Sequence, residues 1–151
     1  MIKHIWSLLS KESKIDADTN NLSIHDIYES LQFDVSSNGQ AYDLTKPFVV
    51  PFQFEITSLF FRDKKGSKET YSEQVVLLDP KGIELGRADT KMIFESEHDR
   101  MRNRIKYTSI ALTTSGTYIF QIYSGKEDKL ERDGVAAIPV DISLKVDGKV
   151  L

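Results

Sequence analysis

The chain has 151 residues, of which 40% are hydrophobic and 28% are charged, and its net charge is −3. This composition is ordinary for a globular protein of one domain with its own core, and it excludes disordered and fibrous classes. The lack of cysteine excludes disulfide frameworks, thiolate zinc sites and cysteine nucleophiles.

Charge and hydropathy also bear on partners and location. The negative net charge argues against nucleic acid or an anionic membrane as the default partner. Residues 1–10 contain too short an apolar run for a signal peptide, and no segment approaches the roughly 20 apolar residues of a membrane span. We therefore expect a single cytoplasmic domain over residues 1–151.

The N-terminal third predicts two strands with irregular patterns. Ile2 to Leu9 forms the first, with Trp6 on the same core face as Ile2 and Leu8. Leu22 to Val35 forms the second, and its apolar residues change phase in the middle. A bulge near His25 and Asp26 would produce this change, and a short helix over Ile24 to Leu31 is the alternative.

Alternation is clearer from Pro47 onward. Phe48, Val50, Phe52, Phe54 and Ile56 lie on one face of a predicted strand. Pro47 and Pro51 lie on its opposite face and have no amide proton for a sheet ladder. We expect this strand to lie at a sheet edge or to begin late.

Five further strands follow in the second half of the chain. Their predicted bounds are Tyr71 to Leu78, Ile83 to Phe94, Ile105 to Leu112, Tyr118 to Ile122 and Ile138 to Val146. Asp79-Pro80-Lys81-Gly82 predicts a hairpin turn between the first two, because proline presets its φ and glycine accepts a left-handed conformation. Ser115 and Gly116 predict another hairpin. Only Glu95 to Arg102 is a candidate for a further helix, and it is short and polar.

In the last strand Ile138, Val140, Ile142 and Leu144 should all face inward, because they alternate with polar residues and proline. About eight short strands with frequent turns indicate an all-β fold. We expect an antiparallel two-sheet sandwich, immunoglobulin-like or jelly-roll-like.

Several short stretches resemble a family of small bacterial proteins of unknown function. They are Trp6 to Leu9, Ile15-Asp16, Thr19-Asn20-Asn21, Ser23, Glu29, Phe54-Glu55 and Ser58-Leu59. The resemblance covers about the first 60 residues of the sequence. It implies a β-sandwich, and it carries over no catalytic residue, cofactor or partner.

Two polar clusters have residue types that could hold a metal ion, but both are better explained as ordinary surface loops. Asp16, Asp18 and Asn20 have the alternating spacing of calcium ligands, yet Asn21 and Ile27 stand where that loop needs glycine and glutamate. We predict a hairpin loop there, with side chains bonding nearby amides. Glu95 to Asp99 gathers four donors on one polar loop, where they would not converge on a metal.

Other titratable groups give no enzyme signature. His4 lies two residues from the apolar Ile2 and Trp6 and so on the same face of the predicted strand. This position is typical of a half-buried histidine whose ring nitrogens are hydrogen-bonded. The sequence contains no Gly-x-Ser-x-Gly motif, phosphate-binding glycine loop or His-Glu-x-x-His helix. We expect no catalytic residue, no cofactor and no metal.

The most suggestive feature is a row of cations: Arg100, Arg102, Arg104 and Lys106 alternate with Met101, Asn103, Ile105 and Tyr107. In an extended segment these cations would lie on one face about 6.5–7 Å apart. The row could dock an acidic protein partner. Alternatively, it is a solvated face neutralised by Glu95, Glu97 or Asp99, or a charged edge that deters aggregation.

These observations favour a noncatalytic binding or assembly module with the cation row as its surface. One alternative is a carbohydrate-binding sandwich that stacks sugars on Tyr42, Tyr71 or Tyr123. A hydrolase with a loop-borne site is the other. The oligomeric state is left open.

Overall fold

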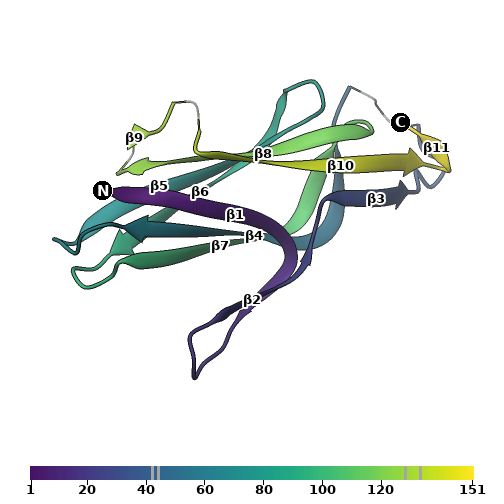
Figure 1. Cartoon of the computed structure of the whole chain (residues 1–151). Helices are drawn as coiled ribbons and strands as arrows, with labels where there is room; N and C mark the ends of the chain where they lie inside the picture. Colours follow the sequence, from purple (N-terminus) through teal and green to yellow (C-terminus); the bar gives the residue numbers. More distant parts are fainter. Residues whose placement is uncertain (42, 44, 128, 133) are drawn as a thin grey trace.

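The computed structural model describes residues 1–41, 43, 45–127, 129–132 and 134–151, and its regular elements are strands arranged in two sheets (Figure 1). One sheet has the order β2-β1-β4-β7, where the strands are Leu22–Ile27, Ile2–Ile15, Phe48–Arg62 and Arg100–Leu112. We call it the four-stranded sheet. No helix in the described part of the chain is long and apolar enough to cross a membrane.

The other sheet has the order β11-β10-β8-β5-β6, with β3 beside β10 and β9 beside β8. Its strands are β3 (Ser30–Val35), β5 (Glu69–Leu78), β6 (Glu84–Phe94), β8 (Gly116–Lys126), β9 (Lys129–Leu130), β10 (Ala136–Val146) and β11 (Lys149–Val150). We call it the seven-stranded sheet. The all-β two-sheet expectation is confirmed, with eleven strands over the described residues instead of eight.

The core lies between the two sheets and consists of their inward-facing residues. In β10, Val140, Ile142 and Leu144 are buried, and Ile138 is half-buried against the same cluster. The predicted inward face of this strand is therefore confirmed. A second, smaller apolar cluster around Phe60 and Phe94 fills the end of the sandwich near the N-terminus.

The predicted Leu22 to Val35 strand is two strands in different sheets. β2 pairs with β1, whereas β3 runs parallel to β10 in the opposite sheet. Asp26 has a φ of 54°, and the chain crosses between the sheets after Ile27. Both the single bulged strand and the helix over Ile24 to Leu31 are wrong, because the phase change marks a change of sheet.

The first turn prediction is confirmed and the second is wrong. Asp79 closes the β5–β6 hairpin: its carboxylate accepts the amides of Lys81 and Ile83, both at 2.8 Å. The turn at Ser115 and Gly116 does not close a hairpin, because β7 and β8 lie in different sheets. A turn signal predicts a chain reversal and does not specify which sheet receives the next strand.

The β7–β8 crossing is held by the buried hydroxyl of Tyr118. This hydroxyl donates to the Thr114 carbonyl at 2.7 Å and accepts the amides of Thr113 and Thr114 at 2.9 and 3.2 Å. A tyrosine early in a strand that bonds backbone a few residues upstream is the tyrosine corner of immunoglobulin-type sandwiches. Gly116 has a φ of 146°, and an added Cβ would lie 2.7 Å from Pro80.

Two other local expectations need correction. β4 lies between β1 and β7, so it is not an edge strand overall. Its first half, which contains Pro51, pairs only with β7, and the register shifts between Pro51 and Phe54. Glu95 to Arg102 is a turn followed by the start of β7 and not a helix.

We expect Tyr118→Phe to lower the free energy of unfolding by about 1–3 kcal/mol, because two amides would lose their buried acceptor. Denaturant unfolding measures the change. Tyr123→Phe, in a half-buried position on the same strand, is the control and should have a much smaller effect. Equal losses in the two variants would contradict the role given to the corner.

Candidate functional site

The cation row lies on the outer face of the four-stranded sheet. All four cations belong to β7, and the alternate residues Met101, Asn103, Ile105 and Tyr107 point into the sandwich. Because side chains alternate across a strand, the four cations point outward together. The segment is extended, which is the condition under which the cations share one face.

The predicted neutralising carboxylates do not pair with the row. Glu95 forms an ion pair with Lys68 at 2.9 Å, and Glu97 accepts the Ser96 hydroxyl at 2.6 Å. Among the described residues, no ion pair joins a cation of the row to a carboxylate. Glu55 is the cross-strand partner of Lys106, and it is buried without an ion pair to it.

The β1–β2 hairpin arches over this outer face. We call residues 11–27 of this hairpin the arm. Figure 1 shows that β1 bends sharply and that the arm lies below β4 and β7 in that view. Arg102 donates to the Asn20 carbonyl at 3.0 Å and to its side-chain oxygen at 2.7 Å. Arg104 reaches the Ser13 carbonyl at 3.4 Å. The two middle arginines therefore connect the arm to the sheet through neutral acceptors.

The tip of the arm is a turn in which one side chain accepts hydrogen bonds from groups of the same turn. One oxygen of the Asp16 carboxylate accepts the amides of Asp18 and Thr19 at 3.0 and 2.7 Å. The Thr19 hydroxyl donates to the same oxygen at 2.9 Å, and these bonds lower the pKa of Asp16. The predicted hairpin loop with side chains bonding local amides is confirmed.

A groove of about 420 Å³ lies between the arm and the sheet. Trp6, Leu59 and Met101 from the sheet and Leu22 from the arm provide its apolar lining. The remaining lining is polar and consists of Thr19, Asn20, Asn21, Arg100 and Arg102. Trp6, Leu22 and Leu59 are half-buried and belong to neither core cluster, whereas Met101 packs against the smaller cluster. No carboxylate in the described part of the chain lines this groove.

The prediction that Trp6 belongs to the core is wrong. Trp6 is paired with Leu59 after a register shift in β1 between His4 and Trp6. The extra residue, Ile5, moves Trp6 and Leu8 to the outer face, while Ile2 remains buried inside. No sequence signal marks this bulge.

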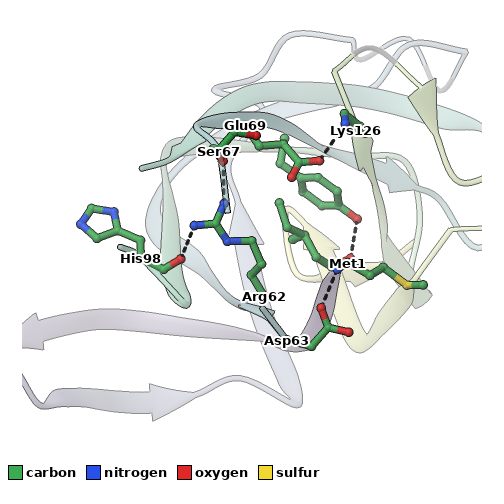
Figure 2. Close-up of polar contacts among 9 residues, drawn as sticks. Met1, Arg62, Asp63, Ser67, Glu69, His98 and Lys126 are labelled. Carbon is green, nitrogen blue, oxygen red and sulfur yellow. Dashed lines mark hydrogen bonds and ion pairs between the residues drawn. The ribbon is translucent and has the colours of Figure 1, made fainter. Parts of the chain in front are cut away.

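The Glu95 to Asp99 loop is organised by a buried arginine at the end of β4. Arg62, 3% exposed, donates to the carbonyls of Glu95, Ser96 and His98 at 2.5, 3.2 and 2.7 Å. Figure 2 shows its guanidinium directed at His98 and at Ser67, whose carbonyl accepts at 3.0 Å. The loop's carbonyl oxygens are thus occupied by a cation of the chain itself.

No metal cluster is assembled around that loop. Among the described residues, no group of three histidine, aspartate or glutamate side chains could hold a metal ion. The expectation that Glu95 to Asp99 binds no structural metal stays a prediction.

A chain of polar side chains crosses the interior between the two apolar clusters. His4 bonds Ser7 at 2.7 Å, Ser7 bonds Ser58 at 2.6 Å, and Ser58 donates to Glu73. Asn103, from the strand of the cation row, donates to the other oxygen of Glu73. Both sheets are therefore joined by hydrogen bonds through one carboxylate.

Burial shifts the pKa values of the two titratable groups in this series of hydrogen-bonded side chains. It raises the pKa of Glu73, against the lowering effect of the bonds from Ser58 and Asn103. It also lowers the pKa of His4, whose half-buried ring was predicted. Ser58 and Glu73 are each 1% exposed, so a substrate cannot reach this serine as a nucleophile. In the predicted strand, Glu73 lies two residues from both Tyr71 and Val75, so it shares their face. This was the sequence signal available for a buried glutamate.

Comparison with known proteins adds no function. No protein-family model matches the chain, and no curated protein matches it. Among solved structures it is similar to an immunoglobulin-like protein from Pseudomonas aeruginosa, with 9% identity, 94% of this chain and 96% of the other covered, and a TM-score of 0.38. It is also similar to the N-terminal domain of PorA, with 9% identity, 95% and 99% covered, and a TM-score of 0.25.

We expect the arm tip to bind no calcium with useful affinity, because one Asp16 oxygen already accepts three hydrogen bonds and the loop offers too few further oxygens. Titration calorimetry with calcium checks this. Micromolar binding that Asp16→Ala abolishes would contradict the expectation.

The raised pKa of Glu73 predicts a specific pH dependence of stability. The folded state binds this proton more tightly than the unfolded state does. The contribution to the unfolding free energy is therefore largest below the ordinary pKa of 4.5 and is lost as pH rises through the raised pKa.

Glu73→Gln tests this sign, because glutamine does not titrate. We expect the stability of the variant relative to the wild type to increase from pH 4.5 to pH 8, as measured by denaturant unfolding at each pH. Glu131→Gln, at an exposed position, is the control and should give a flat difference. A flat difference for Glu73→Gln as well would contradict the assignment.

Proposed function

We propose that this protein is a noncatalytic binding module that docks an acidic, extended segment of a protein partner on its cation row. The single observation that carries the proposal is the row itself. Arg100, Arg102, Arg104 and Lys106 point outward on one strand, and no described carboxylate forms an ion pair with them. Such like charges repel one another unless a partner compensates them.

The geometry of the row favours an extended occupant. Alternate side chains of a strand are about 6.5–7 Å apart, and carboxylates at alternate positions of an extended segment have the same spacing. β7 is also the last strand of its sheet. An extended segment lying along the outer face of β7 would place its acidic side chains against the cations and next to the groove that Arg100 and Arg102 border.

The alternative functions have less support. Tyr71 is buried in the smaller apolar cluster, so it is not available to stack on a sugar. Tyr123 is half-buried, and Tyr42 lies outside the described residues. The serine and carboxylate that could suggest a hydrolase are enclosed between the sheets.

We also propose that the chain belongs to the family of small bacterial proteins of unknown function that its N-terminal residues resemble. Five of the residues that carry this resemblance line the arm groove: Trp6, Thr19, Asn20, Asn21 and Leu59. Part of the resemblance therefore lies on the same face as the proposed docking surface.

The docking proposal is tested with a nine-residue peptide of alternating glutamate and serine, by calorimetry at two salt concentrations. We expect measurable binding at low salt that weakens as the Debye length falls from about 10 Å at 0.1 M to about 3 Å at 1 M. Arg100→Glu/Lys106→Gln should weaken binding about tenfold or more. These end positions are chosen because Arg102 and Arg104 also hold the arm.

A matched variant separates local from global charge effects. Lys81→Glu/Lys145→Gln makes the same change in net charge at two exposed positions away from the row, in the β5–β6 turn and on β10. It should leave binding almost unchanged. Equal losses in both variants, or no salt-sensitive binding by the wild type, would overturn the proposal.

A further inference from the structure

We infer that the arm groove binds one large apolar side chain of the docked segment, so that the recognised motif is a phenylalanine or leucine flanked by acidic residues. This inference rests on the proposed docking function and names the specificity of that site. It is carried by the juxtaposition of the apolar side chains in a groove of mixed polarity, Trp6 among them, with the first two cations of the row.

The apolar lining comes from four strands, and three of its side chains face outward from the core. Trp6 lies on β1 and Leu59 on β4, where they are cross-strand partners. Leu22 begins β2 and faces them from the arm. Half-buried apolar side chains on the outside of a sheet leave area that a partner's side chain would remove from water.

The size and charge of the groove fit such a side chain. Its volume of about 420 Å³ falls in the range of about 300–1,000 Å³ typical of ligand pockets. Arg100 and Arg102 line it, whereas no aspartate or glutamate of the described residues does. An apolar group with neighbouring carboxylates would therefore find both an apolar floor and cations at its border.

Trp6 is the specificity-determining residue in this arrangement. A ring or branched aliphatic group entering the groove would pack on its indole and displace water from it. Hydrogen bonds from Arg102 to Asn20 hold the arm tip beside the same groove. The groove is thus bounded on one side by the sheet and on the other by the arm.

The test uses Trp6 as its own reporter, because the chain contains one tryptophan. The probe is the glutamate–serine peptide with phenylalanine in place of its central glutamate, so that the ring shares a face with the remaining carboxylates, and it is compared with the same peptide carrying serine at that position, which has the same charge. We expect the phenylalanine peptide to bind about tenfold tighter, as burial of one such side chain allows. The Trp6 emission should shift to shorter wavelength with that peptide alone.

Leu22→Ser should abolish the preference for phenylalanine while leaving the salt-sensitive binding of the original peptide in place. Ile83→Ser is the matched control, since Ile83 is an exposed apolar residue at the β5–β6 turn. If Leu22→Ser does not fold by circular dichroism, Trp6→Leu measured by calorimetry is the second variant. It should reduce the preference in the same way.

The outcomes separate the two proposals. Equal affinities for both peptides and unchanged emission would overturn the inference and leave the docking function standing. Absence of salt-sensitive binding by either peptide would overturn both. An acidic oligosaccharide that shifts the emission, with peptides that do not, would also overturn both and identify a sugar site.

Discussion

The register of β7 is the constraint on which the rest of the outer face depends. Tyr107 stacks on Phe54 of β4 with ring centroids 4.6 Å apart and planes within 3°. Asn103 donates to the buried Glu73 across the interior. A slip of one residue would move these groups to solvent and place four cations in the core, so the interior contacts of β7 determine the position of the row.

The hydrogen-bonded side chains from His4 to Glu73 help to fix this register of β7, and their burial lowers the free energy of unfolding. A buried carboxylate is expensive unless it is hydrogen-bonded, and here both of its oxygens accept bonds, from Ser58 and from Asn103. These donors come from β4 and β7, while Glu73 belongs to β5 of the opposite sheet. The carboxylate therefore aligns the two sheets at the point where the apolar clusters are interrupted.

Arginine serves two different purposes in this fold. Arg62 is enclosed and binds backbone carbonyls, so it organises the loops at one end of the sandwich. Arg102 and Arg104 are on the outer face and hold the arm through neutral oxygens, which leaves their charge without a carboxylate partner. The same chemical group is structural in the first case, and in the second it connects structure with the proposed docking surface.

The sequence by itself determined the elements whose pattern is local. Alternation in β10 and the Asp79 turn were predictable, because period-two burial and turn chemistry depend on neighbouring residues. The outward direction of the cation row was predictable only if its segment is extended, since the predicted strand began at Ile105 and not at Arg100. An all-β sandwich followed from the number of such strands.

Only the tertiary structure decided how these elements meet. The bulge that moves Trp6 outward, the crossing from β2 to β3 and the arch of the arm depend on contacts between residues far apart in the chain, such as Arg102 with Asn20. The candidate groove exists only through those contacts, because Trp6, Leu22 and Leu59 share no sequence pattern and meet where three strands come together.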